Sequence, residues 1–200
     1  MPKNPLYDTY AVTLYFDSHT NELILEAMKD IAAVTGNNYM LENSVPPHLS
    51  LGLFHAEEEK AGEMEKLFCE FAESLKSEGL NLSLNFNGPD NFADKVIFLS
   101  VKCDEPLMKL NRELHQLFLP HFEAGDNRNY LPENWVPHIA LAVKLDAKQF
   151  EKGFEAAKNF PLPGTAKITS ATLARCNPYN EVVKVIISFF HSVQSCHICI

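Results

Sequence analysis

The sequence predicts an α+β fold of two lobes that is built from a duplicated unit. Segments with the two-residue alternation of β-strands recur between segments in which apolar residues follow helical spacing. Each half of the chain contains strand, helix, strand, strand, and a Pro-His motif stands at matching places in both halves. Two copies indicate duplication, since stacked repeats usually number about three or more. No linker rich in Gly, Ser or Pro separates the halves, so we expect one domain over residues 1–200 with interleaved lobes.

Strand and helix patterns alternate along the first half of the chain. Runs of β-branched and aromatic residues predict strands, and amphipathic periodicity predicts helices. Ser18 or Thr20 can cap the first helix and Gly36 ends it, whereas Gly88-Pro89 predicts the start of a loop. The predicted elements are strands at residues 10–16, 46–54, 80–86 and 96–101, and helices between residues 18 and 36 and at residues 57–78.

The second half repeats this organisation. A helix with a leucine stripe ends before Pro120, and a polar loop then leads to a strand that opens with proline. The predicted elements are helices at residues 106–118 and 146–158, a loop at residues 123–134, and strands at residues 137–143, 168–174 and 182–190.

Two of the predicted strands match residue by residue. Pro47-His48-Leu49-Ser50-Leu51-Gly52-Leu53 aligns with Pro137-His138-Ile139-Ala140-Leu141-Ala142-Val143. Because side chains alternate across a strand, Leu49, Leu51 and Leu53 and their counterparts are expected to face the core. His48 and His138 then face the other way, between small residues that leave room for a ligand. A two-fold arrangement of the halves would place these histidines opposite each other across one cleft.

Two opposed imidazoles suit a reaction that needs a base and an acid at once. The pKa of an unperturbed histidine is about 6.5, so near neutral pH one ring can be neutral while the other is protonated. One ring would deprotonate water or a hydroxyl and the other would protonate a leaving oxygen, as displacement at a phosphodiester requires. Ser50, two residues along the same face as His48, can donate a hydrogen bond to a phosphate oxygen. The structural alternative is a strand histidine satisfied within the fold, and the repetition of the motif weighs against it.

Composition limits the classes of partner. With 17 basic and 26 acidic residues the net charge is −9, which argues against a protein that holds long nucleic acid. No apolar run approaches the length of a membrane span and no signal-peptide core follows the N-terminus, so we expect a soluble, cytoplasmic protein without membrane partners. Nothing demands more than a monomer. The odd number of cysteines predicts no disulfide framework, and the C-terminal Cys196-His197-Ile198-Cys199 lacks the second ligand pair of a structural zinc site, so we expect no metal and no cofactor.

On these motifs the sequence resembles the 2H phosphoesterase superfamily, in its LigT-like or 2′,5′-RNA ligase-like branch. That group carries two His-x-Ser/Thr motifs on strands at roughly this interval, and His48-Leu49-Ser50 matches in full. The resemblance implies two antiparallel β-sheets that flank a central cleft, with helices on the outside. It also implies metal-independent opening of a cyclic phosphodiester, typically an RNA 2′,3′-cyclic phosphate opened to a 2′-phosphate, and in some members 2′–5′ RNA joining. His48 and His138 would form the acid/base pair, and Ser50 would contact the phosphate.

The second motif departs from the family pattern, because Ala140 stands where the second hydroxyl belongs. The arginine that family members tend to carry soon after this motif is also missing, since Val143 and Lys144 occupy that region. These departures leave open a catalytically weakened nucleotide- or phosphate-binding protein on the same fold. A metallohydrolase that uses the remaining, scattered histidines is a third alternative.

Aromatic residues near the motif strands are candidates for binding a small nucleotide or an RNA end. Tyr130 and Trp135, which precede the second motif, are the predicted substrate-binding residues, because bases stack on aromatic rings. Tyr39 and Phe92 lie in similar positions, and ordinary packing is the alternative for all four. Arg175 and Lys184 are candidate cations for the cleft.

Overall fold

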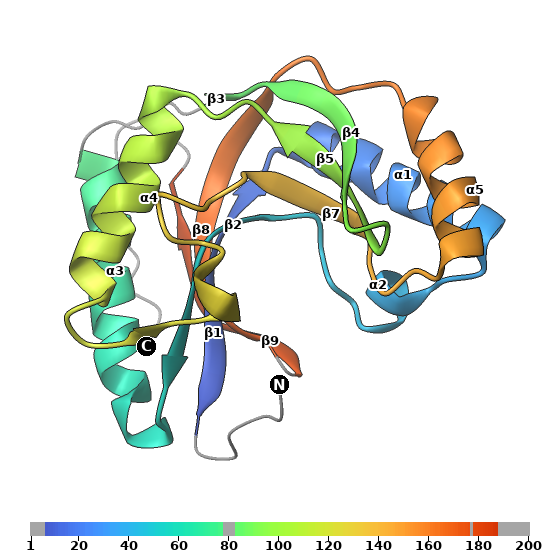
Figure 1. Ribbon diagram of the computed structural model, residues 1–200. Coiled ribbons are helices and arrows are strands. Elements are labelled where there is room, and N and C mark those ends of the chain that lie inside the picture. Colours follow the sequence, from blue (N-terminus) through green and yellow to red (C-terminus); the bar gives the residue numbers. More distant parts are fainter. Residues whose placement is uncertain (1–6, 78–82, 177, 188–200) are drawn as a thin grey trace.

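The computed structural model describes residues 7–77, 83–176 and 178–187, and these residues form two antiparallel sheets with helices on their outer sides (Figure 1). The predicted α+β class with two antiparallel sheets is therefore confirmed. Residues 80–82 and 188–190 of two predicted strands, and Cys196 and Cys199, lie outside the described residues. Among the described helices, none is long and apolar enough to cross a membrane.

The large sheet has the strand order β3-β8-β1-β2-β6, and β9 also pairs with β8. Helices α3 and α4 pack side by side, with α3 against β8 and β9 and α4 against β2. The strands are β1 (Asp8–Phe16), β2 (Leu49–Ala56), β3 (Ser83–Leu84), β6 (Glu123–Ala124), β8 (Ala166–Cys176) and β9 (Tyr179–Ile186), and the helices are α3 (Ala61–Ser77) and α4 (Glu105–Phe118). A short 3-10 turn, η1 (Glu58–Lys60), precedes α3.

The small sheet has the strand order β4-β5-β7. Helix α1 packs against β7 and α5 against β4 and β5, and the two helices also contact each other (Figure 1). The strands are β4 (Phe86–Phe92), β5 (Val96–Val101) and β7 (His138–Ala142), the helices are α1 (Ser18–Thr35) and α5 (Ala147–Lys158), and a short helix, α2 (Tyr39–Glu42), follows α1.

The two halves of the chain exchange their hairpins. The β4–β5 hairpin follows β2 in sequence but pairs through β5 with β7, the motif strand of the second half. The β8–β9 hairpin follows β7 but pairs through β8 with β1, which lies next to β2. Each motif strand consequently shares a sheet with the hairpin of the other half, and the two motif strands lie in different sheets.

Two local expectations are corrected. Asp17, rather than Ser18 or Thr20, caps α1, and its carboxylate accepts a hydrogen bond from the Thr20 backbone N–H at 3.0 Å. The segment Gly88-Pro89 continues strand β4 instead of opening a loop. Among the described strands β4 lies at the edge of its sheet, next to β5, and an edge strand is where a sheet tolerates a proline, which has no N–H to donate.

A β-bulge interrupts both motif strands at the same position of the repeat. The pairing of β1 with β2 passes from Val12–Gly52 to Thr13–Ser50 and skips Leu51. The pairing of β5 with β7 passes from Ile97–Ala142 to Phe98–Ala140 and skips Leu141. Because one extra residue reverses the alternation of faces, the residues beyond each bulge change sides.

This reversal corrects the expected core. Leu49 and Leu51 are buried as predicted, but beyond the bulge Phe54, and not Leu53, is fully buried. Gly52 also lies on the core side, where a Cβ would meet Leu114 of α4 at 3.0 Å. In the second copy Ala142 is buried and Val143 lines the hollow described below, the reverse of the strict alternation.

Candidate active site

A hollow of about 560 Å³ brings the two motif strands together. The large sheet contributes His48 and Ser50, and the small sheet contributes His138 and Ala140. The connection between α4 and β7 closes a third side. From this connection come Asp126, Asn129, Tyr130, Asn134 and Trp135. All five residues predicted as site residues therefore line one hollow.

The two histidines are held in the same way. Nδ1 of His48 lies 2.8 Å from the carbonyl oxygen of Pro46, and Nδ1 of His138 lies 2.8 Å from that of Val136. A carbonyl oxygen only accepts hydrogen bonds, so each Nδ1 carries a proton and donates it. When the ring is neutral, Nε2 is then the basic nitrogen. Each imidazole can thus accept a proton at Nε2 as a base or release one from Nε2 as an acid.

Electrostatics distinguishes the two rings. Burial lowers the pKa of both His48 and His138, while the hydrogen bond to a carbonyl raises the pKa of each. A charge on His138 lowers the pKa of His48 further. The carboxylate of Asp126 raises the pKa of His138 and partly opposes the effect of burial. The charge of Asp126 therefore favours the protonated form of His138, and a charge on His138 favours the neutral form of His48.

Aromatic rings enclose His138 more closely than His48. The ring centroids of Phe92 and Phe98 lie 4.9 Å and 5.2 Å from that of His138, and the Tyr130 ring lies 6.2 Å away. On the large sheet, the ring of Tyr15 contacts His48 edge-on at 6.5 Å. These contacts restrict the rotation of both imidazoles, because each ring is fixed by a hydrogen bond and by neighbouring side chains.

Ser50 is the centre of a small hydrogen-bond network. Its side chain bonds the phenol of Tyr130, and its carbonyl oxygen accepts a hydrogen bond from Nε1 of Trp135 at 3.2 Å. Burial raises the pKa of Tyr130, so its phenol stays protonated. Trp135 is buried, and its indole N–H ties the connection to strand β2. Tyr130 and Trp135 therefore form a wall whose position depends on Ser50.

Asn111 of α4 is a positioning residue that the sequence did not single out. Its side chain is fully buried, and Nδ2 donates to the carbonyl oxygens of Leu51 at 2.8 Å and Tyr130 at 3.1 Å. The first oxygen belongs to the residue that the β1–β2 pairing skips, and the second belongs to the wall of the hollow. Asn111 is one of several polar residues in α4, and no pattern in the sequence distinguishes it from the others.

Other candidate residues do not line the hollow. The ring of Tyr39 lies under Nζ of Lys144 at 3.7 Å. Arg175 forms an ion pair with Asp8 and a hydrogen bond with a tyrosine hydroxyl of β1. Lys184 of β9 lies 4.8 Å from the ring of Tyr15, beyond the ring that contacts His48. Phe92, in contrast, does line the hollow.

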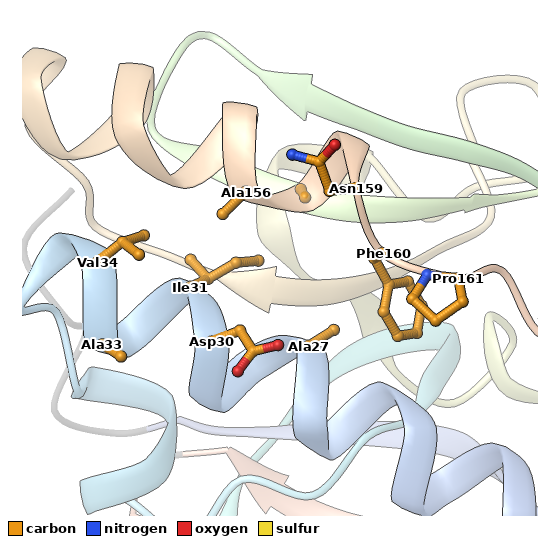
Figure 2. Close-up of a pocket in the computed structure, with 10 residues that line it drawn as sticks. Ala27, Asp30, Ile31, Ala33, Val34, Ala156, Asn159, Phe160 and Pro161 are labelled. Atoms are coloured by element: carbon orange, nitrogen blue, oxygen red, sulfur yellow. The ribbon is translucent and has the colours of Figure 1, made fainter.

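A second hollow, of about 340 Å³, lies between α1 and α5 (Figure 2). Ala27, Ile31, Val34 and Ala156 form much of its surface, and Asp30 is its only carboxylate. No histidine, serine, threonine or cysteine is among the described residues that line this second hollow. Among the described residues, no group of three or more His, Cys, Asp or Glu side chains is placed to hold a metal ion.

Comparison with known proteins agrees with this architecture. A family model described as the 2′-5′ RNA ligase superfamily matches residues 17–178. No curated protein matches the chain. The structure is similar to that of Escherichia coli LigT in apo form, with a TM-score of 0.50 and 15% identity over 90% of this chain and 97% of that chain. It is also similar to Kluyveromyces marxianus Usb1, with a TM-score of 0.50 and 10% identity over 91% of this chain and 98% of that chain.

At these identities the structural likeness establishes a shared fold. The family match is broader evidence, because it runs from the start of α1 to the turn before β9 and includes both motif strands. The resemblance expected from the two histidine motifs is thereby confirmed. The chain belongs to the 2′-5′ RNA ligase superfamily of 2H phosphoesterases.

Proposed function

We propose that this protein is a metal-independent phosphodiesterase that opens a cyclic phosphodiester by His/His acid–base catalysis. The substrate would be an RNA end with a 2′,3′-cyclic phosphate or a small cyclic nucleotide. The observation that carries the proposal is the matched pair His48 and His138, both with Nδ1 bonded to a carbonyl and both lining one hollow. Two such rings supply the base and the acid that displacement at phosphorus needs.

The reaction divides between the two rings. Water attacks phosphorus and its proton passes to Nε2 of His48, which is the base because a charge on His138 disfavours its protonation. The P–O3′ bond breaks, and the Nε2–H of His138 donates its proton to the leaving O3′. The product carries a 2′-phosphate and a free 3′-hydroxyl, and proton exchange with solvent restores both rings. In the same direction, with an RNA 5′-hydroxyl in place of water as the attacking group, the same chemistry would join two ends through a 2′–5′ bond and release the same 3′-hydroxyl.

Ser50 is the proposed contact for a non-bridging phosphate oxygen, with Tyr130 and Trp135 as the wall against the nucleoside. A hydroxyl preset at this point stabilises negative charge as it develops at phosphorus. Ala140 offers no such group at the matching position of the second copy, so only the first motif contributes a hydroxyl to phosphate binding. No Lys or Arg is among the described residues that line the hollow, which favours a small substrate or an RNA end over long nucleic acid.

The proposal is tested by incubating the purified protein with nucleoside 2′,3′-cyclic phosphates in excess chelator and identifying the products by ³¹P NMR. We expect the 2′-phosphate to form, and we expect His48→Ala and His138→Ala each to lower kcat by about 10²–10⁴-fold. His19→Ala is the matched control, because His19 is exposed at the start of α1 and lies outside the hollow. Full activity in either motif variant, or activity abolished by the chelator, would contradict the mechanism.

One observation, the lost hydroxyl at Ala140, favours a second candidate function. On this alternative the protein binds a nucleotide or phosphate without turning it over. Calorimetry would then detect binding of cyclic phosphates while no product forms from any of them. Turnover that depends on both histidines would exclude this alternative.

A further inference from the structure

One wall of the hollow carries a negative charge that phosphate binding does not explain. Asp126 is the only Asp or Glu among the described lining residues, and no Lys or Arg accompanies it. Asp126 is exposed on this wall and its carboxylate repels a phosphate group, so beyond its effect on the pKa of His138 it is suited to bind a different ligand group. Groups that a carboxylate binds well are N–H donors, and nucleobases present such donors on their edges.

The backbone holds Asp126 in an unusual conformation. Asp126, Asn127 and Arg128 have φ values of 47°, 51° and 66°, a region that residues other than glycine rarely adopt. The segment is anchored on both sides, since Gly125 N donates to the Leu53 carbonyl at 2.8 Å and Asn134 Nδ2 donates to the Arg128 carbonyl at 3.1 Å. Three consecutive residues kept in this region by such contacts point to a functional constraint on the direction of the segment.

The carboxylate lies within electrostatic reach of the centre of the hollow. Its charge raises the pKa of His138, and it adds to the increase that burial causes in the pKa of Tyr130. The amide of Asn129 lies beside it, with Nδ2 3.5 Å from Oδ2 of Asp126, and the amide of Asn134 lines the same wall. This wall therefore offers carboxylate acceptors next to amide groups that can donate.

Two rings next to this wall can hold a planar base. Phe92 and Tyr130 both line the hollow, and both contact the ring of His138, at 4.9 Å and 6.2 Å between centroids. Phe92 keeps 36% of its surface exposed, which leaves its ring accessible to a ligand. Base–aromatic stacking tolerates any base, so discrimination among bases must come from the polar wall.

We propose that this hollow is selective for guanine, with Asp126 accepting hydrogen bonds from the two N–H donors of its Watson–Crick edge. The amide of Asn129 or Asn134 would donate to the neighbouring O6 of the base. Uracil suits the wall poorly, because its single N–H lies between two carbonyl oxygens that would face the carboxylate. Adenine and cytosine each place an amino group beside a ring nitrogen that lacks a proton, so they satisfy one carboxylate oxygen. This inference rests on the proposed function, because the phosphate must bind at the two histidines for the base to lie against this wall.

Calorimetry tests the inference without requiring turnover. Guanosine 2′-monophosphate and uridine 2′-monophosphate are titrated into the protein, into Asp126→Asn, and into Glu133→Gln as control. Glu133 is exposed in the same connection and does not line the hollow, so its variant removes an equal charge elsewhere. We expect the guanine nucleotide to bind about ten-fold tighter or more, as bidentate base contacts typically provide. Asp126→Asn should lose most of that ratio, and Glu133→Gln should keep it.

The ratio of the two affinities separates base recognition from simple charge repulsion. If Asp126→Asn strengthens both nucleotides equally, the carboxylate acts only through repulsion and the inference is wrong. Equal affinities in the parent protein, or no binding of either nucleotide, would also overturn it. Selective binding of the guanine nucleotide without turnover would refute the proposed hydrolysis and support guanine recognition. Equally fast hydrolysis of guanosine and uridine 2′,3′-cyclic phosphates would support the proposed hydrolysis and refute guanine recognition.

Discussion

Replacing Asn111 by alanine should destabilise the fold and loosen the wall of the active site together. The side chain is fully buried in α4, and its Nδ2 donates to the carbonyl oxygens of Leu51 and Tyr130. Alanine cannot donate to either oxygen, so the buried carbonyl of Leu51 and the partly buried carbonyl of Tyr130 both lose this partner. The first lies at the bulge of β2, beside Ser50, and the second lies in the connection that lines the hollow.

The size of the effect follows from these two acceptors. A buried acceptor left unpaired costs about 1–3 kcal/mol, and because the Tyr130 oxygen is only partly buried the pair costs at most roughly 6 kcal/mol. Part of this is returned, because Oδ1 of Asn111 is itself buried without a hydrogen-bond partner and its removal relieves that penalty. We therefore expect the free energy of unfolding to fall by about 2–4 kcal/mol. For a chain of this length that corresponds to a decrease in Tm of roughly 4–16 °C.

Chemical denaturation and thermal melting measure this loss, and Asn87→Ala is the matched control. Asn87 is exposed, and its Nδ2 donates to Ser100 Oγ at 3.2 Å, so its removal should change stability by no more than about 0.5 kcal/mol. A nucleotide titration below the melting range should also show weaker binding to Asn111→Ala, because the Tyr130 wall has lost one anchor. An Asn111→Ala protein as stable as the parent would show that these two hydrogen bonds do not stabilise the fold.

The other predictions concern the chemistry and the packing of the small lobe. The pH profile of kcat/KM should be bell-shaped, because activity rises as His48 loses its proton and falls as His138 loses its proton. Burial lowers the pKa of both rings, so the optimum should lie below about pH 6.5, and an optimum above about pH 7.5 would contradict this. Ala140→Ser should raise kcat by up to about 10²-fold if it restores a phosphate contact, and a steady-state assay that finds no gain would show that another group already fills this role. Gly153→Ala should lower Tm despite the better helix propensity of alanine, because the new Cβ would lie 2.9 Å from Ile97 Cδ1. Melting at or above the parent temperature would show that the Ile97 side chain moves to make room for the Cβ.

The repeated motif made the centre of the site predictable from the sequence. A strand displays its faces by alternation alone, so the placement of His48 and His138 opposite the aliphatic core residues follows from each short segment. Duplication then predicts that two such faces meet across one cleft. The same local logic predicted most helices and strands, because amphipathic periodicity is a property of the segment itself.

Other features of the site lay beyond such patterns. The bulges that skip Leu51 and Leu141 have no local signal, and they move Val143 to the hollow and Ala142 to the core. Asp126 sits in a polar loop whose composition predicts exposure but not direction. The exchange of hairpins was not readable either, because β4 and β8 have the same strand pattern whichever sheet they join.

The α+β class, the repeat and the pair of histidines on matching strands can all be inferred from the amino-acid sequence. These features depend on side-chain periodicity within segments, and a chain carries that information locally. The three-dimensional structure was needed to show which strands share a sheet, how the two rings are hydrogen-bonded, that Asp126 lines the same hollow, and that Asn111 bonds the carbonyls of Leu51 and Tyr130. These features depend on contacts between segments that are distant along the chain, and the free energy of such contacts is set by the packing of the whole fold.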